Sequence, residues 1–116
     1  MLDAGAVVTN GTDAPVEDVN PIESFYASVT RKRADGKATF FPEQAMTREE
    51  ALYSYTAAPA YAAFQEDERG TLAPGMQADF VLLSNDLRDC AEEEILATEV
   101  LATYVAGKRQ YEATSR

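Results

Sequence analysis

The chain of 116 residues contains no histidine, no tryptophan and a single cysteine, Cys90. Without histidine it cannot by itself build a histidine-based catalytic triad, a zinc finger or a structural zinc cluster. A disulfide framework requires at least two cysteines, so we interpret Cys90 as a lone, unreactive thiol in a reducing, intracellular compartment.

Basic residues are scarce as well, with 10 Lys and Arg against 20 Asp and Glu and a formal net charge of −10. A surface of this sign repels phosphate, so we expect no nucleic-acid partner. Only three of the basic residues are lysine: Lys32, Lys37 and Lys108. An excess of arginine over lysine beside many acids is typical of a salt-adapted, halophilic surface, where salt screens the self-repulsion. An ordinary acidic cytosolic protein explains the composition equally well.

Long hydrophobic runs are also missing. No segment reaches the roughly 18 apolar residues that a membrane helix needs. Residues Met1–Gly5 carry no basic stretch ahead of an apolar core, so they do not resemble a signal peptide. We therefore expect a soluble, cytoplasmic chain with no membrane partner. A hydrophobic content of 46% favours one folded domain rather than disorder.

The first half predicts a strand followed by a helix. The β-branched, apolar run Ala6–Asn10 predicts a buried strand that ends in a loop at Gly11–Pro15. Asn20, Pro21 and Glu23 form a helix-start pattern, with Asn20 as the cap and Glu23 at the capping-box position. The apolar face of this helix is Ile22, Phe25, Tyr26 and Val29. Basic residues 31–33 are expected to close it, where cations complement the helix dipole.

A second helix is predicted from the capping-box sequence Thr47–Glu50, with Ala51, Leu52 and Tyr55 on its apolar face. Pro59 cannot sit undisturbed in a helix interior, so we expect a break at Thr56–Ala58 and a short restart at Pro59. We interpret the aromatic side chains at helical spacing as core residues; they are Tyr26, Tyr53, Tyr55, Tyr61 and Phe64.

The second half predicts three strands and one helical turn. Four consecutive apolar residues in the strand Asp79–Leu83 indicate that both of its faces are covered. Glu92–Leu96 predicts a single helical turn, residues 100–111 predict a hairpin around Gly107–Lys108, and residues 112–116 are expected to fray. The opening strand lacks a sequence partner for a parallel sheet, so we expect a piece of a longer fold.

Several motifs resemble one family when they are taken in order. Gly11–Val16, Asn20–Pro21 and Thr30–Arg31 resemble the last barrel strand and helix of YtcJ-like metal-dependent amidohydrolases. The likeness continues through Thr47–Leu52, Tyr55–Thr56, Ala60–Phe64, Gly70–Gly75, Ala78–Leu83 and a final hairpin from Val100 to Lys108. It covers about Leu2 to Tyr111, and the order and separation of the motifs make it specific. Some members of this group are labelled exoenzyme regulatory proteins.

The resemblance implies a fold. The family combines a TIM barrel with a composite β-sandwich to which both ends of the chain contribute strands. This chain is then a mixed α/β fragment, with residues 1–66 as the last βα portion of the barrel. Residues 67–116 supply C-terminal antiparallel strands of the sandwich, and we expect the isolated chain to form one compact unit.

The resemblance also implies chemistry. Members use one or two divalent metals, with zinc the expected ion, to hydrolyse non-peptide carbon–nitrogen bonds of small amide-type substrates. Asp13 matches the aspartate after the last barrel strand, which contacts the metal and takes a proton from the attacking water. The histidine ligands of the family have no counterpart here, and one carboxylate does not hold a catalytic metal. Asp13 is therefore expected to be catalytic and metal-binding only in a full-length parent, and the isolated chain is expected to bind no metal and to be inactive.

Simpler interpretations stay open beside these. In the isolated chain, the favoured interpretation of Asp13 is a loop residue that makes local backbone hydrogen bonds. Asp79 is expected to serve structure, and Glu92–Glu94 are interpreted as a solvated helix start rather than a cation site.

For the whole chain, the alternative is a free-standing regulatory or interaction module whose orphan strands are covered by a partner, most simply another copy. An unrelated small α+β domain is the third interpretation. If the chain is a cut piece, Val7, Phe25 and Val81 should be partly exposed in a monomer.

Overall fold

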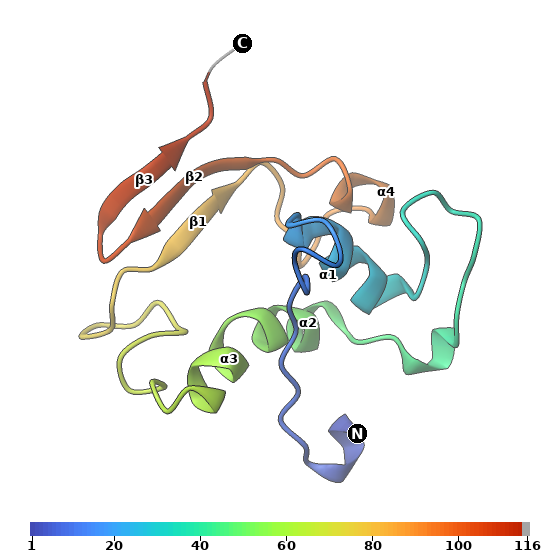
Figure 1. The fold of residues 1–116 in the computed structure, drawn as a ribbon, viewed down its shortest axis with the longest axis horizontal. Helices are drawn as coiled ribbons and strands as arrows, with labels where there is room; N and C mark the ends of the chain where they lie inside the picture. The colour runs from blue at the N-terminus through green and yellow to red at the C-terminus, as the bar shows by residue number, and fades with distance from the viewer. Residues whose placement is uncertain (115–116) are drawn as a thin grey trace.

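Four short helices and a three-stranded sheet make up the regular structure in the computed structural model, which describes residues 1–114 (Figure 1). The sheet lies on one side of the molecule and the helices on the other (Figure 1). The elements are α1 (Pro21–Thr30), α2 (Arg48–Tyr55), α3 (Ala57–Ala62), β1 (Phe80–Leu83), α4 (Glu92–Ile95), β2 (Val100–Val105) and β3 (Lys108–Glu112). Short 3₁₀ turns occur at Leu2–Ala4 and Pro42–Gln44.

The predicted strand at Ala6–Asn10 is wrong. This segment follows the 3₁₀ turn without joining the sheet, and it runs beside α2 (Figure 1). It is attached to α2 through Asn10, whose backbone N–H donates to the carbonyl of Ser54 at 2.9 Å. The run is β-branched and apolar, but a strand requires a neighbour for its backbone groups, and β1–β3 lie elsewhere.

Helix α1 begins where the capping pattern predicts it. The Asn20 side chain accepts a hydrogen bond from the backbone N–H of Ile22 at 3.0 Å, and Pro21 occupies the first turn. The end of the helix differs from the prediction. Arg31 is left-handed with φ 58° and stops α1 at Thr30, so the basic residues 31–33 follow the last turn instead of forming it.

The predicted interruption of the second helix is confirmed, and the restart is earlier than expected. Thr47 and Glu50 form the full capping box, with bonds of 3.1 and 2.8 Å. Thr56 leaves helical geometry at φ −123° and ψ −81° and separates α2 from α3. Helix α3 begins at Ala57 rather than at Pro59, because a proline in the first turn loses no intrahelical hydrogen bond.

The three strands form one antiparallel sheet in the order β1-β2-β3. The three strands predicted in the second half of the chain agree with the observed ones to within a residue, and the hairpin turns at Ala106 and Gly107. Residues 112–116 were expected to fray, but Glu112 belongs to β3 and the N–H of Ala113 donates to the carbonyl of Leu101 at 2.8 Å. Residues 115 and 116 lie outside the described residues.

The prediction that both faces of the strand Asp79–Leu83, now β1, are covered is wrong. Val81 and Leu82 point to opposite faces and are each 49% exposed. Pairing with β2 and β3 places Val81, Leu101, Val105 and Tyr111 on one face of the sheet, and all four are exposed. We call this set the open sheet face. The opposite face carries a stacked pair, Phe80 and Tyr104, with ring centroids 4.5 Å apart.

The buried core joins segments from both halves of the chain. It consists of Ile22, Phe25 and Tyr26 from α1, Ala51 from α2, Leu87 from the loop after β1, and Ile95 from α4. Loop residues after β1 and helix α4 therefore pack against α1 and α2. Within residues 1–114, we find no helix with the length and apolar character needed to cross a membrane.

Several predicted core residues are instead exposed. Tyr53, Tyr61 and Phe64 are 48%, 53% and 92% exposed, whereas Tyr26 is buried and Tyr55 packs against the core. Helical spacing identifies a common face but does not supply a layer to cover it. Of the three residues expected to be exposed in a cut piece, Val7 and Val81 are about half exposed and Phe25 is buried.

Candidate functional site

Asp13 lies at the surface in the loop that leads from the N-terminal segment into α1. Its backbone is left-handed with φ 55°, a region that aspartate and asparagine tolerate better than most residues. Its main-chain carbonyl accepts from the N–H of Val16 at 2.9 Å and closes a tight turn. This hydrogen bond uses the main chain of Asp13 and not its carboxylate, and the residue is exposed.

The Asp13 loop is tethered at both ends. On the N-terminal side, the Asn10 amide donates to the hydroxyl of Ser28 at 3.1 Å and to the hydroxyl of Ser54 at 3.0 Å. On the other side, Asn20 caps α1, and its own backbone N–H donates to the Asp18 carboxylate at 3.3 Å. Asn10 was not among the candidates from the sequence. The sequence does carry a signal for Asn10, which is a polar amide at the end of an apolar run. Once such an amide is half-buried, it requires a hydrogen-bond partner.

The other acidic candidates have structural roles. The Asp79 carboxylate accepts from the N–H of Ala106 at 2.7 Å and lies 3.8 Å from a guanidinium nitrogen of Arg69. It therefore links the start of β1 to the hairpin turn, as expected for a residue that serves structure.

Residues Glu92–Glu94 open α4. The Glu94 carboxylate accepts from the N–H of Ala91 at 2.8 Å; alanine has no side-chain acceptor with which to complete a capping box. Glu92 pairs with Lys32, and this hydrogen bond and charge raise the pKa of Lys32. These contacts agree with a helix start, which the Lys32–Glu92 pair links to the segment just after α1.

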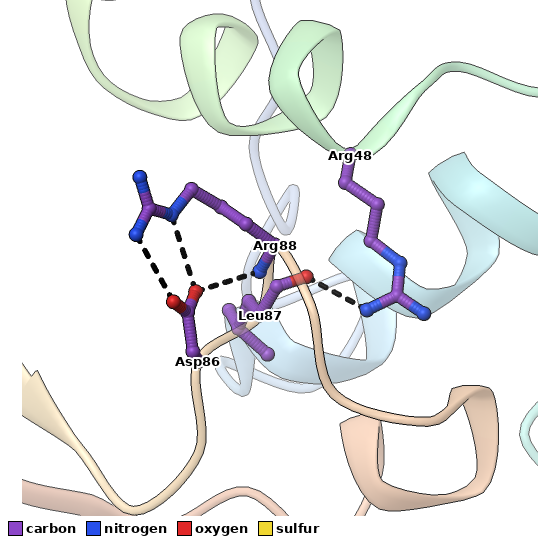
Figure 2. A network of polar contacts seen from close by, with 4 residues as sticks. All are labelled: Arg48, Asp86, Leu87 and Arg88. Atoms are coloured by element: carbon purple, nitrogen blue, oxygen red, sulfur yellow. Dashed lines mark hydrogen bonds and ion pairs between the residues drawn. The ribbon is translucent and has the colours of Figure 1, made fainter.

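A second polar network lies between α2 and the loop after β1 (Figure 2). Arg48 at the start of α2 donates to the carbonyl of Leu87 at 2.8 Å and approaches the sulfur of Cys90 at 3.6 Å. Asp86 accepts from the guanidinium of Arg88 at 3.0 and 3.2 Å and from its backbone N–H at 2.9 Å. Hydrogen bonds from Arg88 lower the pKa of Asp86, and the carboxylate raises the pKa of Arg88. The network fastens the loop beside the core and was not predicted.

The residues of this chain do not fit a catalytic metal by themselves. Within the described range 1–114, no group of three or more metal-ligating side chains lies close enough to hold an ion. A catalytic zinc site takes three protein ligands and keeps one open position. Asp13 supplies a single carboxylate, so we derive no catalytic step through a metal from this chain.

Residues 1–111 match the amidohydrolase family, and the chain belongs to that family. It is 39% identical over 114 residues to the N-substituted formamide deformylase of Arthrobacter pascens, covering 98% of this chain and 21% of that protein. It is 37% identical to the protein LONG AFTER FAR-RED 3 of Arabidopsis thaliana, covering 96% of this chain and 19% of that protein. It is 28% identical to the putative amidohydrolase YtcJ of Bacillus subtilis (strain 168), covering 97% of this chain and 22% of that protein.

The fold is shared with a solved protein. A crystal structure of an amidohydrolase from Thermotoga maritima MSB8 superposes with a TM-score of 0.67 at 22% identity, covering 97% of this chain and 24% of that one. The predicted resemblance to the C-terminal segment of YtcJ-like amidohydrolases is therefore confirmed. The chain spans about a fifth of the length of the curated relatives it matches.

Proposed function

We propose that this chain is the C-terminal part of a metal-dependent amidohydrolase that hydrolyses a non-peptide carbon–nitrogen bond of a small amide-type substrate. The observation that carries the proposal is the match of residues 1–111 to the amidohydrolase family. An N-substituted formamide deformylase among the relatives supports a hydrolytic reaction at a carbon–nitrogen bond. The exposed apolar residues of the open sheet face support a chain that is completed by further polypeptide.

Within that enzyme we assign Asp13 as the carboxylate beside the metal that accepts the proton of the attacking water. Its support is an exposed carboxylate on a loop tethered at both ends, directly after the segment that resembles the last barrel strand. The divalent ion, zinc by family resemblance, would be held mainly by residues outside this chain. In keeping with its single carboxylate, we propose that the isolated chain binds no metal and catalyses no hydrolysis.

An alternative function is a regulatory or interaction module without catalysis. The open sheet face favours it, because Val81, Leu101, Val105 and Tyr111 expose between 41% and 51% of their surface. A contiguous exposed apolar patch is typical of a surface that another protein covers. For the isolated chain, both functions lead to the proposal that it self-associates.

The proposal also includes the cellular location of the chain and the partners that its surface charge excludes. We propose a cytoplasmic location, because the lone thiol Cys90 suits a reducing compartment. The net charge of −10 favours solubility at high salt and argues against nucleic acid as a partner.

The test of the proposed function is hydrolysis by the native-length polypeptide carrying Asp13→Asn, assayed on formamides and other small amides. Asparagine keeps the left-handed backbone conformation available but cannot accept the proton. We expect kcat to fall by roughly 10²–10⁴-fold, the range for loss of a general base. The matched control is Glu17→Gln, an exposed acid in the same loop, which should leave kcat unchanged. Full activity of the Asp13 variant would rule out its assigned role.

A further inference from the structure

We propose that Asn10 is a positioning residue for Asp13, because it fixes the start of the Asp13 loop against α1 and α2. The inference rests on the proposed function of Asp13. No contact joins Asn10 to a reacting atom, so its effect would be transmitted through the three intervening peptide units.

The contacts of Asn10 are directional. Its amide nitrogen carries two hydrogens and lies within hydrogen-bond distance of two hydroxyl oxygens, Ser28 at 3.1 Å and Ser54 at 3.0 Å, and of a weaker acceptor, the Met46 sulfur, at 3.8 Å. Each hydroxyl donates its own proton to a helix carbonyl, Ser28 to Ser24 at 2.9 Å and Ser54 to Ala51 at 2.7 Å. Both serines therefore present lone pairs to the amide, and the pattern matches an asparagine at this position.

The other contacts near the Asp13 loop do not fix its start against both α1 and α2, as the side chain of Asn10 does. The run Ala6–Asn10 joins no sheet, and the backbone bond from Asn10 to Ser54 holds it against α2. The turn from Asp13 to Val16 is local and does not fix the loop relative to the helices. With Asn20 at the other end, Asn10 determines where the left-handed turn of Asp13 starts.

A purely structural role makes a different prediction, and Asn85 offers the matched control. The Asn85 amide also donates two hydrogen bonds, to the Glu94 carbonyl and to the Thr98 hydroxyl, both at 3.2 Å. It lies after β1 and is remote in sequence from the Asp13 loop. Asn85→Ala thus removes a similar pair of bonds without touching the loop.

The experiment compares Asn10→Ala and Asn85→Ala in the native-length polypeptide. We expect Asn10→Ala to lower kcat by about 10- to 100-fold with little change in KM, since small displacements of a catalytic group cost rates of this order. Amide hydrogen exchange at Val16 should speed up in the same variant, because its acceptor lies on Asp13. Asn85→Ala should leave kcat and exchange at Val16 at wild-type values. If Asn10→Ala does not fold, Ser28→Ala is the second variant, because it removes one acceptor of the Asn10 amide. It should lower kcat and speed up exchange at Val16 by smaller factors.

The outcomes separate the two proposals. Loss of activity in Asp13→Asn with full activity in Asn10→Ala overturns the positioning role alone. Equal losses of kcat in Asn10→Ala and Asn85→Ala also overturn it, because they indicate general destabilisation. Full activity in Asp13→Asn overturns the proposed function and the positioning role together.

Discussion

Single side chains hold irregular segments of this chain against its helices and sheet. Asn10 fastens the N-terminal segment, Arg48 fastens the loop after β1, and Asp79 fastens the hairpin turn. The structural role of Asp79 follows from its place beside a turn at a strand start. The contacts of Asn10 and Arg48 join residues 18 to 44 positions apart, so no local pattern predicts them.

Gly70 is the residue at which substitution should be costly. Its φ is +99°, and an added Cβ would lie 2.7 Å from the Cβ of Ala60 and 3.1 Å from the Cα of Ala57. We expect Gly70→Ala to lower the free energy of unfolding by roughly 2–4 kcal/mol, since backbone strain and overpacking add. Denaturant unfolding of the isolated chain measures the change.

The control for this substitution is Gly36→Ala. Gly36 also has a positive φ, +68°, but an added Cβ would meet nothing within 4 Å. Gly36→Ala should lower the free energy of unfolding by only about 1 kcal/mol, which is the strain of an alanine in the left-handed conformation. Equal losses for the two variants would show that Gly70 makes no close approach to α3.

Asp86 should contribute a pH-dependent part of the stability. Hydrogen bonds from Arg88 lower the pKa of Asp86 in the folded chain, so folding favours its ionised form. This contribution is present above the unfolded pKa of about 3.9 and is lost as the pH falls through the folded pKa. Asp86→Asn should therefore lower the Tm slightly near neutral pH and leave it unchanged in strong acid, as measured by thermal unfolding across pH. A difference between variant and wild type that grows in acid would contradict this sign.

At the level of elements, the helices and strands with local signals were predictable. The cap at Asn20, the capping box at Thr47 and the turn at Gly107 act within a few residues, and each marks an element boundary to within a residue or two. The segment Ala6–Asn10 was not predictable, because its strand character depends on neighbours that this chain does not supply. The early start of α3 reflects the tolerance of a first helical turn for Pro59.

The capping box of α2 gives an element-level prediction. Thr47→Ala removes the acceptor for the N–H of Glu50 and should destabilise the chain by about 1 kcal/mol. Thr71 lies exposed in a loop, and Thr71→Ala provides the control with the same side-chain change. Far-UV circular dichroism during denaturant unfolding measures both variants. Equal stability of the two would show that the box contributes nothing to α2.

At the level of the whole molecule, the open sheet face and the single carboxylate of Asp13 have a common explanation. On the proposed function, further polypeptide would cover the exposed apolar residues of the sheet and would supply the metal ligands that Asp13 alone does not. The sequence predicted the family because its motifs stand in order along the chain. It could not predict the rest of the proposed site, because a metal centre draws its ligands from distant segments of a protein.

The open sheet face predicts self-association of the isolated chain. Sedimentation velocity should show a mass that rises with concentration, because burying apolar surface favours association. Leu101→Thr combined with Val105→Thr places a β-branched residue of good strand propensity at both positions and should shift the chain toward the monomer. Thr substitution of Val16, an exposed valine in the Asp13 loop, should leave the association unchanged. A wild-type chain that remains monomeric at high concentration would contradict the proposal.

The intact mass of the native polypeptide in its source cells tests the proposed function most directly. Because this chain covers about a fifth of its curated relatives, we predict a mass several times 12.7 kDa. The additional sequence should then contain the histidine ligands that this chain lacks. A native mass near 12.7 kDa would contradict the hydrolase proposal and would favour a free-standing interaction module.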